Sequence, residues 1–292
     1  MKLLYIISQR RSGSTLIENL LGQHQQVISV GEFRMLHGHY LKQGPGSIWD
    51  WKCNCGVHIE YCKFWSNYYQ LVNNENLKNE TALKYKISFW QWIQVLFGNI
   101  NSIVKKNNIQ GKRISHFTLD VYNNIKKDFP GKQIVDSSKD SLQGYYLTQN
   151  SEDVIILYLK RQLRATASSK YKRALMKGQT VSLIKMLILS FLTEIFNNRI
   201  VRLISEERVF SFSYEEFIKK KELIYRQILT VTNLPEKPIP EFFQPYPSHS
   251  IGGTPNRFKK SPITYDDSWK QLYHKHPFAN YLGILLEKLL GK

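Results

Sequence analysis

Short apolar runs bounded by polar residues recur along the chain and predict buried β-strands. These runs cover residues 2–8, 27–30, 132–136, 153–160 and 208–213. Apolar residues at helical spacing predict helices between and after them, over 14–22, 85–106, 116–129, 163–176, 180–204 and 214–232. Because strands alternate with helices, we expect an α/β fold whose parallel sheet is covered by helices on both faces.

One domain is expected to span residues 1–292, since no linker interrupts this pattern. Residues 40–130 differ from the remainder because they combine an irregular stretch with two helical segments. We expect them to form an inserted helical and irregular lobe on the substrate side of the protein. The proline-rich stretch 235–262 predicts an ordered loop that crosses the surface.

The composition adds a strong excess of positive charge. Lys and Arg number 41 and Asp and Glu number 23, so the formal net charge is +18. Such a balance points to an anionic partner, and a nucleic acid, a membrane surface and a phosphorylated nucleotide all fit that description. Since no nucleic-acid-binding module is recognisable and the basic residues are spread along the chain, we expect no nucleic-acid partner.

No segment of the sequence predicts a secretory signal or a membrane span. The first apolar run is too short for a signal peptide. The longest apolar segment, residues 181–196, is interrupted by Lys185 and Glu194 and falls short of the roughly 20 residues that cross a bilayer. A buried helix is expected there. Three closely spaced cysteines cannot all form disulfides with one another, so a cytoplasmic, reducing location is expected.

The segment from Arg10 to Thr15, between the first strand and the first helix, is the first candidate site. Backbone N–H groups and hydroxyls at a helix N-terminus form an anion pocket, to which adjacent arginines add charge. Against the nucleotide P-loop pattern, Ser8 replaces the first glycine and Ser14 replaces the lysine. These differences disfavour an ATPase and favour another phosphate-bearing ligand. The alternative is an ordinary helix start with solvated arginines.

Two further candidate sites follow other predicted strands. Arg161 and Ser169 come after the strand at 153–160, and Asp136-Ser137-Ser138-Lys139 ends the strand at 132–136. Open parallel sheets bind ligands at the carboxyl ends of their strands, where a guanidinium and a hydroxyl suit a phosphate group. The alternative is that these basic residues form a solvated face.

Taken in order, these motifs closely resemble the sulfotransferases that use 3′-phosphoadenosine 5′-phosphosulfate (PAPS). The resemblance is to the bacterial branch and to tyrosylprotein-type and carbohydrate-type members, and it extends from residue 5 to about residue 270. The segments that carry it are Arg11-Ser12-Gly13-Ser14-Thr15, Gly31-Glu32, Val135 to Lys139, Arg161 to Ser169, Tyr214-Glu215, the cysteine segment from Cys53 to Trp65, the segment from His249 to Phe258, and Asp267 to Trp269.

The resemblance implies a P-loop-like sheet, PAPS as co-substrate and 3′-phosphoadenosine 5′-phosphate (PAP) as product. The donor site would consist of the loop Arg11–Thr15 around the 5′-phosphosulfate, Arg161 and Ser169 at the 3′-phosphate, Tyr214 near the adenine and Arg257 over the nucleotide. No metal ion is expected, and the sequence offers no carboxylate pair spaced to hold Mg²⁺ beside the loop.

Transfer of a sulfuryl group to a hydroxyl or amine acceptor requires in-line positioning, cations near the bridging oxygen and a base. Arg11 and Lys139 are the candidate cations. By the resemblance to tyrosylprotein-type members, Glu32 is the candidate general base. The alternatives are a merely structural ion pair of Glu32 with Arg34 or Arg11, and the rival bases His37 and His39, because other sulfotransferases use His.

The chain departs from the family pattern at three places. The usual Arg-Asp-Pro-Arg is Arg161-Gln162-Leu163-Arg164, the proline common before the phosphate loop is Arg10, and the asparagine of a Gly-Asn-Pro segment is Thr254. The first departure puts the turn geometry after that strand in question. The primary phosphate ligands are retained.

Cys53, Cys55 and Cys62, with His58 between them, are candidate ligands for Zn²⁺. Paired C-x₂-C motifs, which are the strong sequence signal for zinc, do not occur here. Buried or redox-inert cysteines in a substrate-side loop are therefore the favoured interpretation.

Two other classes of function remain open as alternatives. One is a small-molecule kinase on the same scaffold, against which the missing P-loop lysine counts. The other is a basic nucleic-acid-binding protein, motivated by the net charge and an aromatic content of 13%. For a sulfotransferase, the expected acceptor is a small molecule or a glycan. The sequence does not predict the oligomeric state.

Overall fold

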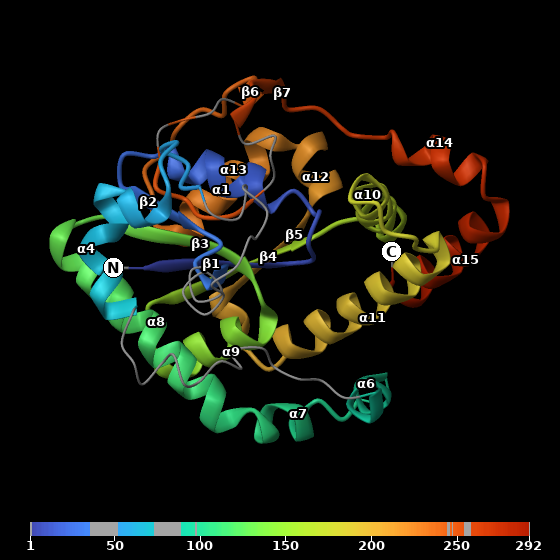
Figure 1. Ribbon diagram of the computed structural model, residues 1–292, viewed down its shortest axis with the longest axis horizontal. Coiled ribbons are helices and arrows are strands. Elements are labelled where there is room, and N and C mark those ends of the chain that lie inside the picture. Colours follow the sequence, from blue (N-terminus) through green and yellow to red (C-terminus); the bar gives the residue numbers. More distant parts are fainter. Residues whose placement is uncertain are drawn as a thin grey trace.

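A five-stranded parallel sheet forms the centre of the computed structural model, which describes residues 2–35, 52–72, 89–96, 98–243, 246, 248–253 and 258–291 (Figure 1). The strands are β1 (Leu3–Ser8), β2 (Val27–Gly31), β3 (Gln133–Lys139), β4 (Val154–Lys160) and β5 (Val209–Ser213). They lie in the order β2-β3-β1-β4-β5, and every neighbouring pair is parallel. The expected α/β fold with a central parallel sheet is confirmed.

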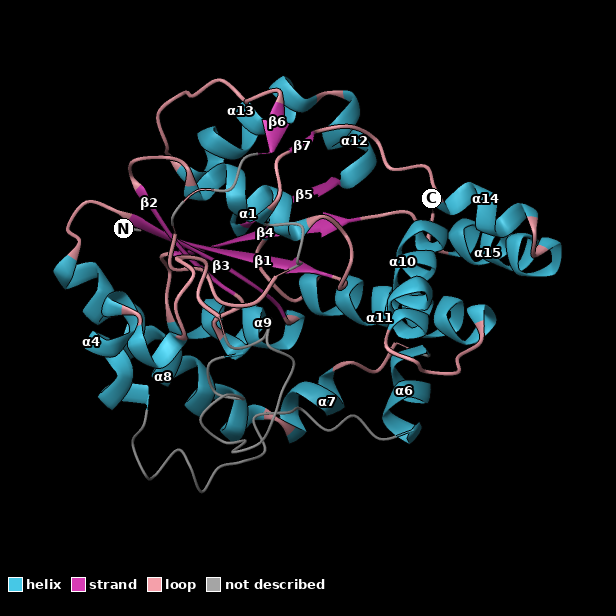
Figure 2. Ribbon diagram, turned by 45° about the horizontal axis from the view of Figure 1, so that its top comes forward, coloured by secondary structure: helices cyan, strands magenta, loops and turns pink. Residues whose placement is uncertain are grey.

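Helices cover both faces of this sheet (Figure 2). One face is covered by α1 (Ser14–Gly22), α12 (Tyr214–Lys219) and α13 (Lys221–Thr232). The other face is covered by α8 (Asn108–Asp128) and α9 (Ser141–Asn150), with α4 (Lys63–Val72) packed on α8 and α11 (Leu183–Val201) packed on α9. The fold is therefore a helix–sheet–helix sandwich.

The central strand β1 shows why the strands were recognisable as apolar runs. Leu3, Tyr5 and Ile7 pack into the core shared with α8 and α9, whereas Leu4 and Ile6 pack into the core shared with α1 and α13. All five side chains are at most 1% exposed. A strand that is buried on both faces has no polar side, so its whole length is apolar.

Three helices lie beyond the carboxyl ends of the strands. They are α10 (Leu163–Met176), α14 (Trp269–His274) and α15 (Pro277–Leu289), and together with α11 they enclose a separate core around Leu187. Arg164 on α10 binds Glu287 on α15 at 3.0 Å. The sequence pattern predicted α10 with its observed bounds, but it did not predict α14 or α15.

The largest differences between predicted and observed helices lie between residues 85 and 129. The single helix expected over 85–106 is divided into α6 (Phe89–Leu96) and α7 (Asn101–Lys106) within the described residues, because Gly98 turns the chain with a φ of 97°. The helix expected from residue 116 begins at Asn108. Gly111 allows this longer helix to pack closely, since a Cβ there would lie 2.0 Å from the ring of Tyr146.

The remaining elements are short. The pair β6 (Phe242–Phe243) and β7 (Ser261–Pro262) is antiparallel, and the 3₁₀ turns η1 (Ile59–Tyr61) and η2 (Glu206–Arg208) precede α4 and β5. Within the described ranges, no helix has both the length and the apolar character needed to cross a membrane.

Candidate active site

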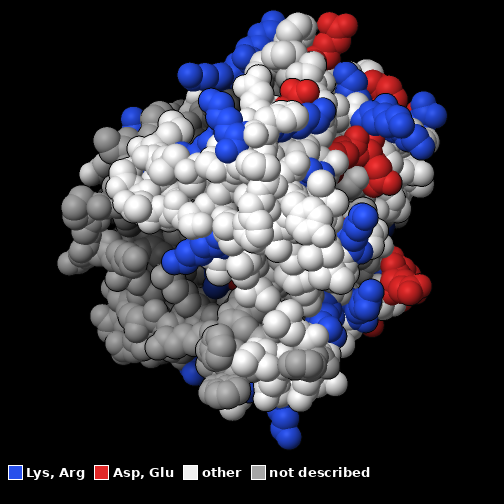
Figure 3. All heavy atoms as spheres, turned by 90° about the vertical axis from the view of Figure 1, so that its right-hand side faces the viewer, with Lys and Arg blue, Asp and Glu red and all other residues white. Residues whose placement is uncertain are grey.

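The described site residues gather at one edge of the sheet. Arg11 follows β1, Glu32 follows β2, Lys139 ends β3, Arg161 follows β4 and Tyr214 follows β5. All five strands are parallel, so these residues lie where the carboxyl ends of the strands meet. Figure 3 views the molecule from the side toward which β1 runs in Figure 1, and a hollow with basic side chains at its rim opens there.

The loop between β1 and α1 is held in a tight, partly left-handed conformation. Arg11 has a φ of 73° and Gly13 a φ of 95°, and the hydroxyl of Ser12 donates to the carbonyl of Gln9 at 2.7 Å. A left-handed conformation costs a residue such as arginine about 1–3 kcal/mol and is typical of functional sites. At Gly13 a Cβ would also lie 2.6 Å from the ring of Tyr214.

The N-terminus of α1 adjoins this loop and carries no side-chain cap or acidic residue of its own. Gly13 stands at the N-cap position and has no side chain with which to cap the helix, and the first turn carries no acidic residue. Ser14 is buried and Thr15 is partly buried beside it. The positive end of the helix and its first N–H groups therefore suit an anion, as the sequence predicted for Arg11–Thr15.

Arg11 joins the loop to the helix after β4. Its Nε donates to the hydroxyl of Ser169 on α10 at 2.8 Å. Arg161 in turn donates to the carbonyl oxygen of Arg11 at 2.9 Å. The two separately predicted phosphate sites, one after β1 and one after β4, are thus adjacent in the structure.

Arg161 is held between an aromatic ring and a carboxylate. Its guanidinium carbon lies 4.6 Å from the centre of the Tyr214 ring, and its NH2 group lies 3.2 Å from Oδ2 of Asp266. The arginine side chain is 8% exposed, whereas that of Asp266 is 53% exposed. Asp266 could not be identified from the sequence, because a solvated aspartate after a proline-rich loop gives no signal of its own.

Like charges accumulate around Arg11. Burial, followed by the positive charges of Arg173 and Arg161, lowers the pKa of Arg11, and Asp266 offsets only part of this effect. Three guanidinium groups close to one another repel, so the arrangement favours a bound polyanion. Arg173 was not singled out from the sequence, since it lies within a basic helical stretch.

Glu32 and Lys139 form a second group at the same edge. Lys139 Nζ lies 2.7 Å from Glu32 Oε1, which also accepts the N–H of Gly253 at 2.9 Å. Burial raises the pKa of Glu32, but the charge and hydrogen bond of Lys139, the charge of Arg10 and the Gly253 N–H together bring it below its ordinary value. Glu32 is therefore a carboxylate at neutral pH.

The ion-pair partners suggested for Glu32 by the sequence differ from the observed one. Arg34 forms an ion pair with Asp140, and the partner of Glu32 is Lys139. Lys139 has a φ of 70°, and its ammonium also donates to the carbonyl of Ser137 at 3.0 Å. The two residues proposed for acid–base work and charge stabilisation are thus in direct contact.

A buried polar network supports the loop from behind. Gln9 Nε2 donates to Glu194 of α11 at 2.7 Å, and Lys170 Nζ donates to Gln9 Oε1 at 2.8 Å. Burial is the main cause that lowers the pKa of Lys170 to about 8. Glu194, which interrupts the long apolar segment of the sequence, is 1% exposed. A charged residue occurs in that segment because its carboxylate supports the loop after β1.

A hydrogen bond to Glu215 holds the turn after β4, where the sequence has Gln162-Leu163. The N–H of Gln162 donates to the carboxylate of Glu215 at 3.0 Å, and α10 starts at the following residue, Leu163. Glu215 therefore has a structural role beside Tyr214. Arg257, His37 and His39 lie outside the described residues.

Comparison with solved structures gives the fold. A sulfotransferase domain from the curacin biosynthetic pathway is 17% identical, with a TM-score of 0.57 over 94% of this chain and 90% of that chain. A sulfotransferase from Alicyclobacillus acidocaldarius is 12% identical, with a TM-score of 0.44 over 88% of each chain. No protein-family model and no curated protein matches the sequence. The chain has the fold of the sulfotransferases.

Proposed function

We propose that this protein transfers a sulfuryl group from PAPS to a hydroxyl or amine acceptor. The observation that carries the proposal is the adjacency of two arginines. Arg161 after β4 donates to the backbone carbonyl of Arg11 beside α1, and the Arg11 side chain donates to the hydroxyl of Ser169 on α10. A nucleotide that carries phosphate groups at both its 3′ and 5′ positions requires such a pair. The fold supports the same conclusion.

In this proposal the loop Arg11–Thr15 and the N-terminus of α1 bind the 5′-phosphosulfate. Arg161 and Ser169 bind the 3′-phosphate, and Tyr214 lies near the adenine. Arg257 closes over the nucleotide. The repulsion among the guanidinium groups around Arg11 and the uncapped helix support the presence of an anion here.

The chemistry requires one bond to form and one to break. The acceptor oxygen or nitrogen attacks sulfur, the bond between sulfur and the bridging phosphate oxygen breaks, and PAP leaves with that oxygen. Arg11 and Lys139 stabilise the charge that develops on the bridging oxygen. The acceptor proton passes to Glu32, which is ionised and therefore able to receive it.

The acceptor is proposed to be a small molecule or a glycan. The location is proposed to be the cytoplasm, where PAPS is expected to be available.

A direct test offers ³⁵S-labelled PAPS to the full chain together with pools of phenols, sugars and amines. We expect the label to move to one pool, and Glu32→Gln to abolish this transfer while PAP still binds. Transfer of phosphate from Mg-ATP, with no transfer from PAPS, would replace this proposal with the small-molecule kinase.

A further inference from the structure

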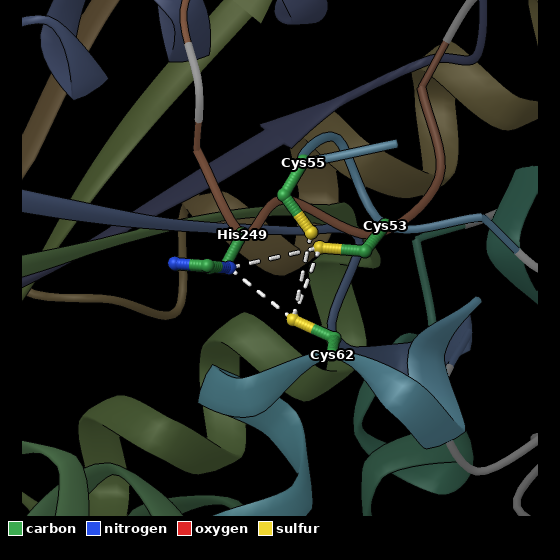
Figure 4. Close-up of side chains that lie close together, drawn as sticks. All are labelled: Cys53, Cys55, Cys62 and His249. Carbon is green, nitrogen blue, oxygen red and sulfur yellow. Dashed lines mark hydrogen bonds between the residues drawn. The ribbon is translucent and has the colours of Figure 1, made fainter. Parts of the chain in front are cut away.

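Three cysteines and one histidine converge beside β2, although they come from two distant parts of the chain (Figure 4). Cys53, Cys55 and Cys62 lie in the segment before α4, and His249 lies in the segment before β7. The three Sγ atoms and one ring nitrogen of His249 all lie within 4.8 Å of one another. Cys53 and Cys62 are buried, and Cys55 is partly exposed.

Four separations between these atoms are close to those of a tetrahedral zinc site. Cys62 Sγ lies 3.6 Å from Cys53 Sγ, 3.7 Å from Cys55 Sγ and 3.2 Å from His249 Nδ1, and Cys53 Sγ lies 3.9 Å from His249 Nδ1. Zn–S bonds of about 2.3 Å and Zn–N bonds of about 2.0 Å place neighbouring ligand atoms about 3.5–3.8 Å apart in a tetrahedron. A disulfide between any two of them would require about 2.05 Å, and it would leave the third thiol beside it.

The backbone around the cysteines is shaped to direct the sulfur atoms inward. Gly56, with a φ of 93°, closes a tight turn in which the N–H of Cys53 donates to the carbonyl of Val57 at 3.0 Å. Backbone N–H groups also donate to the sulfurs, that of Cys55 to Cys53 and that of Trp65 to Cys62. Such N–H bonds to sulfur are the outer-shell contacts that stabilise metal-bound thiolates.

The histidine is fixed as firmly as the cysteines. The ring of His249 stacks on Phe64, with centroids 4.7 Å apart and an interplanar angle of 3°. Its carbonyl oxygen accepts the indole N–H of Trp65 at 2.7 Å. Asn54 holds the two segments together, because its amide donates to the hydroxyl of Ser248 at 2.8 Å. The fourth ligand position is thus pre-organised.

We propose that Cys53, Cys55, Cys62 and His249 bind a structural Zn²⁺ ion. Soft thiolate ligands with one imidazole in a tetrahedral array select zinc, and a site with four protein ligands has no open position for catalysis. The fourth ligand is His249 rather than His58, the histidine that the sequence offered. A resident zinc ion also replaces the earlier interpretation of these cysteines as inert.

The zinc site would stabilise the segment that contacts the end of β2 and Glu32. Cys53 bridges to Ile251, and Ile251 in turn pairs with Gly31 at the end of β2. The carbonyl of Ile251 accepts the N–H of Glu32 at 2.6 Å, and Gly253 donates to the Glu32 carboxylate. Loss of zinc is therefore expected to loosen the segment that orients Glu32, a consequence that rests on the proposed function.

The metal content of the full-length protein tests the site. Protein expressed with added zinc and purified without chelator is analysed for zinc, iron and copper by inductively coupled plasma mass spectrometry, and we expect about one zinc ion per chain. His249→Ala and Cys62→Ser should retain less than about a tenth of it. His58→Ala, in the same turn, is the matched control and should retain zinc fully.

Two measurements on wild-type protein test the site even if these variants fail to fold. Its three thiols should react slowly with a thiol reagent until a chelator removes the metal, and Co²⁺ in place of zinc should show thiolate charge-transfer bands and intense tetrahedral d–d bands. Wild-type protein without zinc, or with iron or copper instead, would overturn the proposal. So would full zinc content in folded His249→Ala.

Zinc binding and nucleotide binding can fail separately. A PAP titration of the same preparation reports the donor site, which shares no ligand residue with the cysteine cluster. Zinc without PAP affinity would contradict the proposed function alone, and PAP affinity without zinc would contradict the metal site alone.

Discussion

The ammonium group of Lys139 lies 2.7 Å from the carboxylate of Glu32, across the carboxyl ends of β3 and β2. Both side chains are largely buried, with exposed fractions of 8% and 16%. Removal of either partner is expected to destabilise the protein, because the remaining charge would stay unpaired in a low-dielectric site. The pair therefore connects the stability of this edge with its proposed chemistry.

Lys139→Met is expected to raise the pKa of Glu32 toward or above its ordinary value of 4.5. A carboxyl pKa lowered by folding stabilises the protein above the unfolded pKa, and this contribution is lost as the pH falls through the folded pKa. The variant should thus be much less stable than wild type at neutral pH, with the difference shrinking on acidification. Urea midpoints measured as a function of pH would show this.

The exposed pair of Lys270 with Asp267, at 3.6 Å, provides the control for that experiment. Lys270→Met should change the stability by less than about 1 kcal/mol at any pH. Equal pH profiles for Lys139→Met and wild type would contradict the role assigned to the buried pair.

Arg161→Ala and Arg11→Ala are each expected to weaken PAP binding roughly tenfold to a hundredfold. A hydrogen bond to a charged group contributes about 1.5–3 kcal/mol, and each arginine is expected to make at least one to a phosphate. The control is Arg226→Ala. Arg226 is an exposed arginine on α13 that pairs with Glu236, and its removal should leave the affinity for PAP unchanged. Calorimetry measures all three, and an unaltered affinity in Arg161→Ala would reject the second phosphate position.

Asp266→Asn is expected to tighten PAP binding by up to about fivefold, since an ion pair whose carboxylate is solvent-exposed contributes about 1 kcal/mol at most. Asp266 engages Arg161 at 3.2 Å and would compete with a phosphate for the same guanidinium. Competition titrations at constant ionic strength give the ratio of affinities. Weaker binding by the variant would mean that Asp266 orients Arg161 for the ligand instead of competing with it.

Gly31→Ala is expected to destabilise the fold by more than about 2 kcal/mol. Gly31 has a φ of 73°, and a Cβ there would lie 2.2 Å from the carbonyl oxygen of Ile251. Gly131 has a similar φ of 81° but no atom within 4 Å of such a Cβ. Gly131→Ala therefore measures only the cost of a left-handed backbone for alanine, about 1–2 kcal/mol. If chemical denaturation gave equal losses in the free energy of unfolding for both variants, the close approach of Ile251 to β2 would be contradicted.

The strands and the phosphate-loop helix could be predicted because their signals are local. Each strand is buried on both faces and is therefore apolar throughout, as β1 illustrates. The helix at 163–176 was found with its observed bounds because its start follows a strand directly. Helix α15 was missed because it exposes Phe278, Tyr281 and Leu289, which obscures a one-sided apolar pattern. Helix α14 has only 6 residues, too few to show a helical period.

The positions of the candidate site could be named from the sequence, but the contacts between them could not. The motif positions identified Arg11, Arg161 and Glu32, yet the contact of Glu32 with Lys139 joins residues from β2 and β3 that only the sheet order brings together. The contact of His249 with the cysteines could not be predicted for the same reason, since nearly 190 positions separate His249 from Cys62. Sequence spacing favoured His58, which is close along the chain only.

Calorimetric titration with PAP, with 5′-AMP and ATP as controls and without added metal, measures whether the chain binds a nucleotide through both of its phosphate positions. We expect micromolar binding of PAP, and a sharp loss of affinity for 5′-AMP because Arg161 and Ser169 then have no 3′-phosphate to bind. Equal affinities for PAP and 5′-AMP, or a preference for Mg-ATP when Mg²⁺ is supplied, would contradict this expectation.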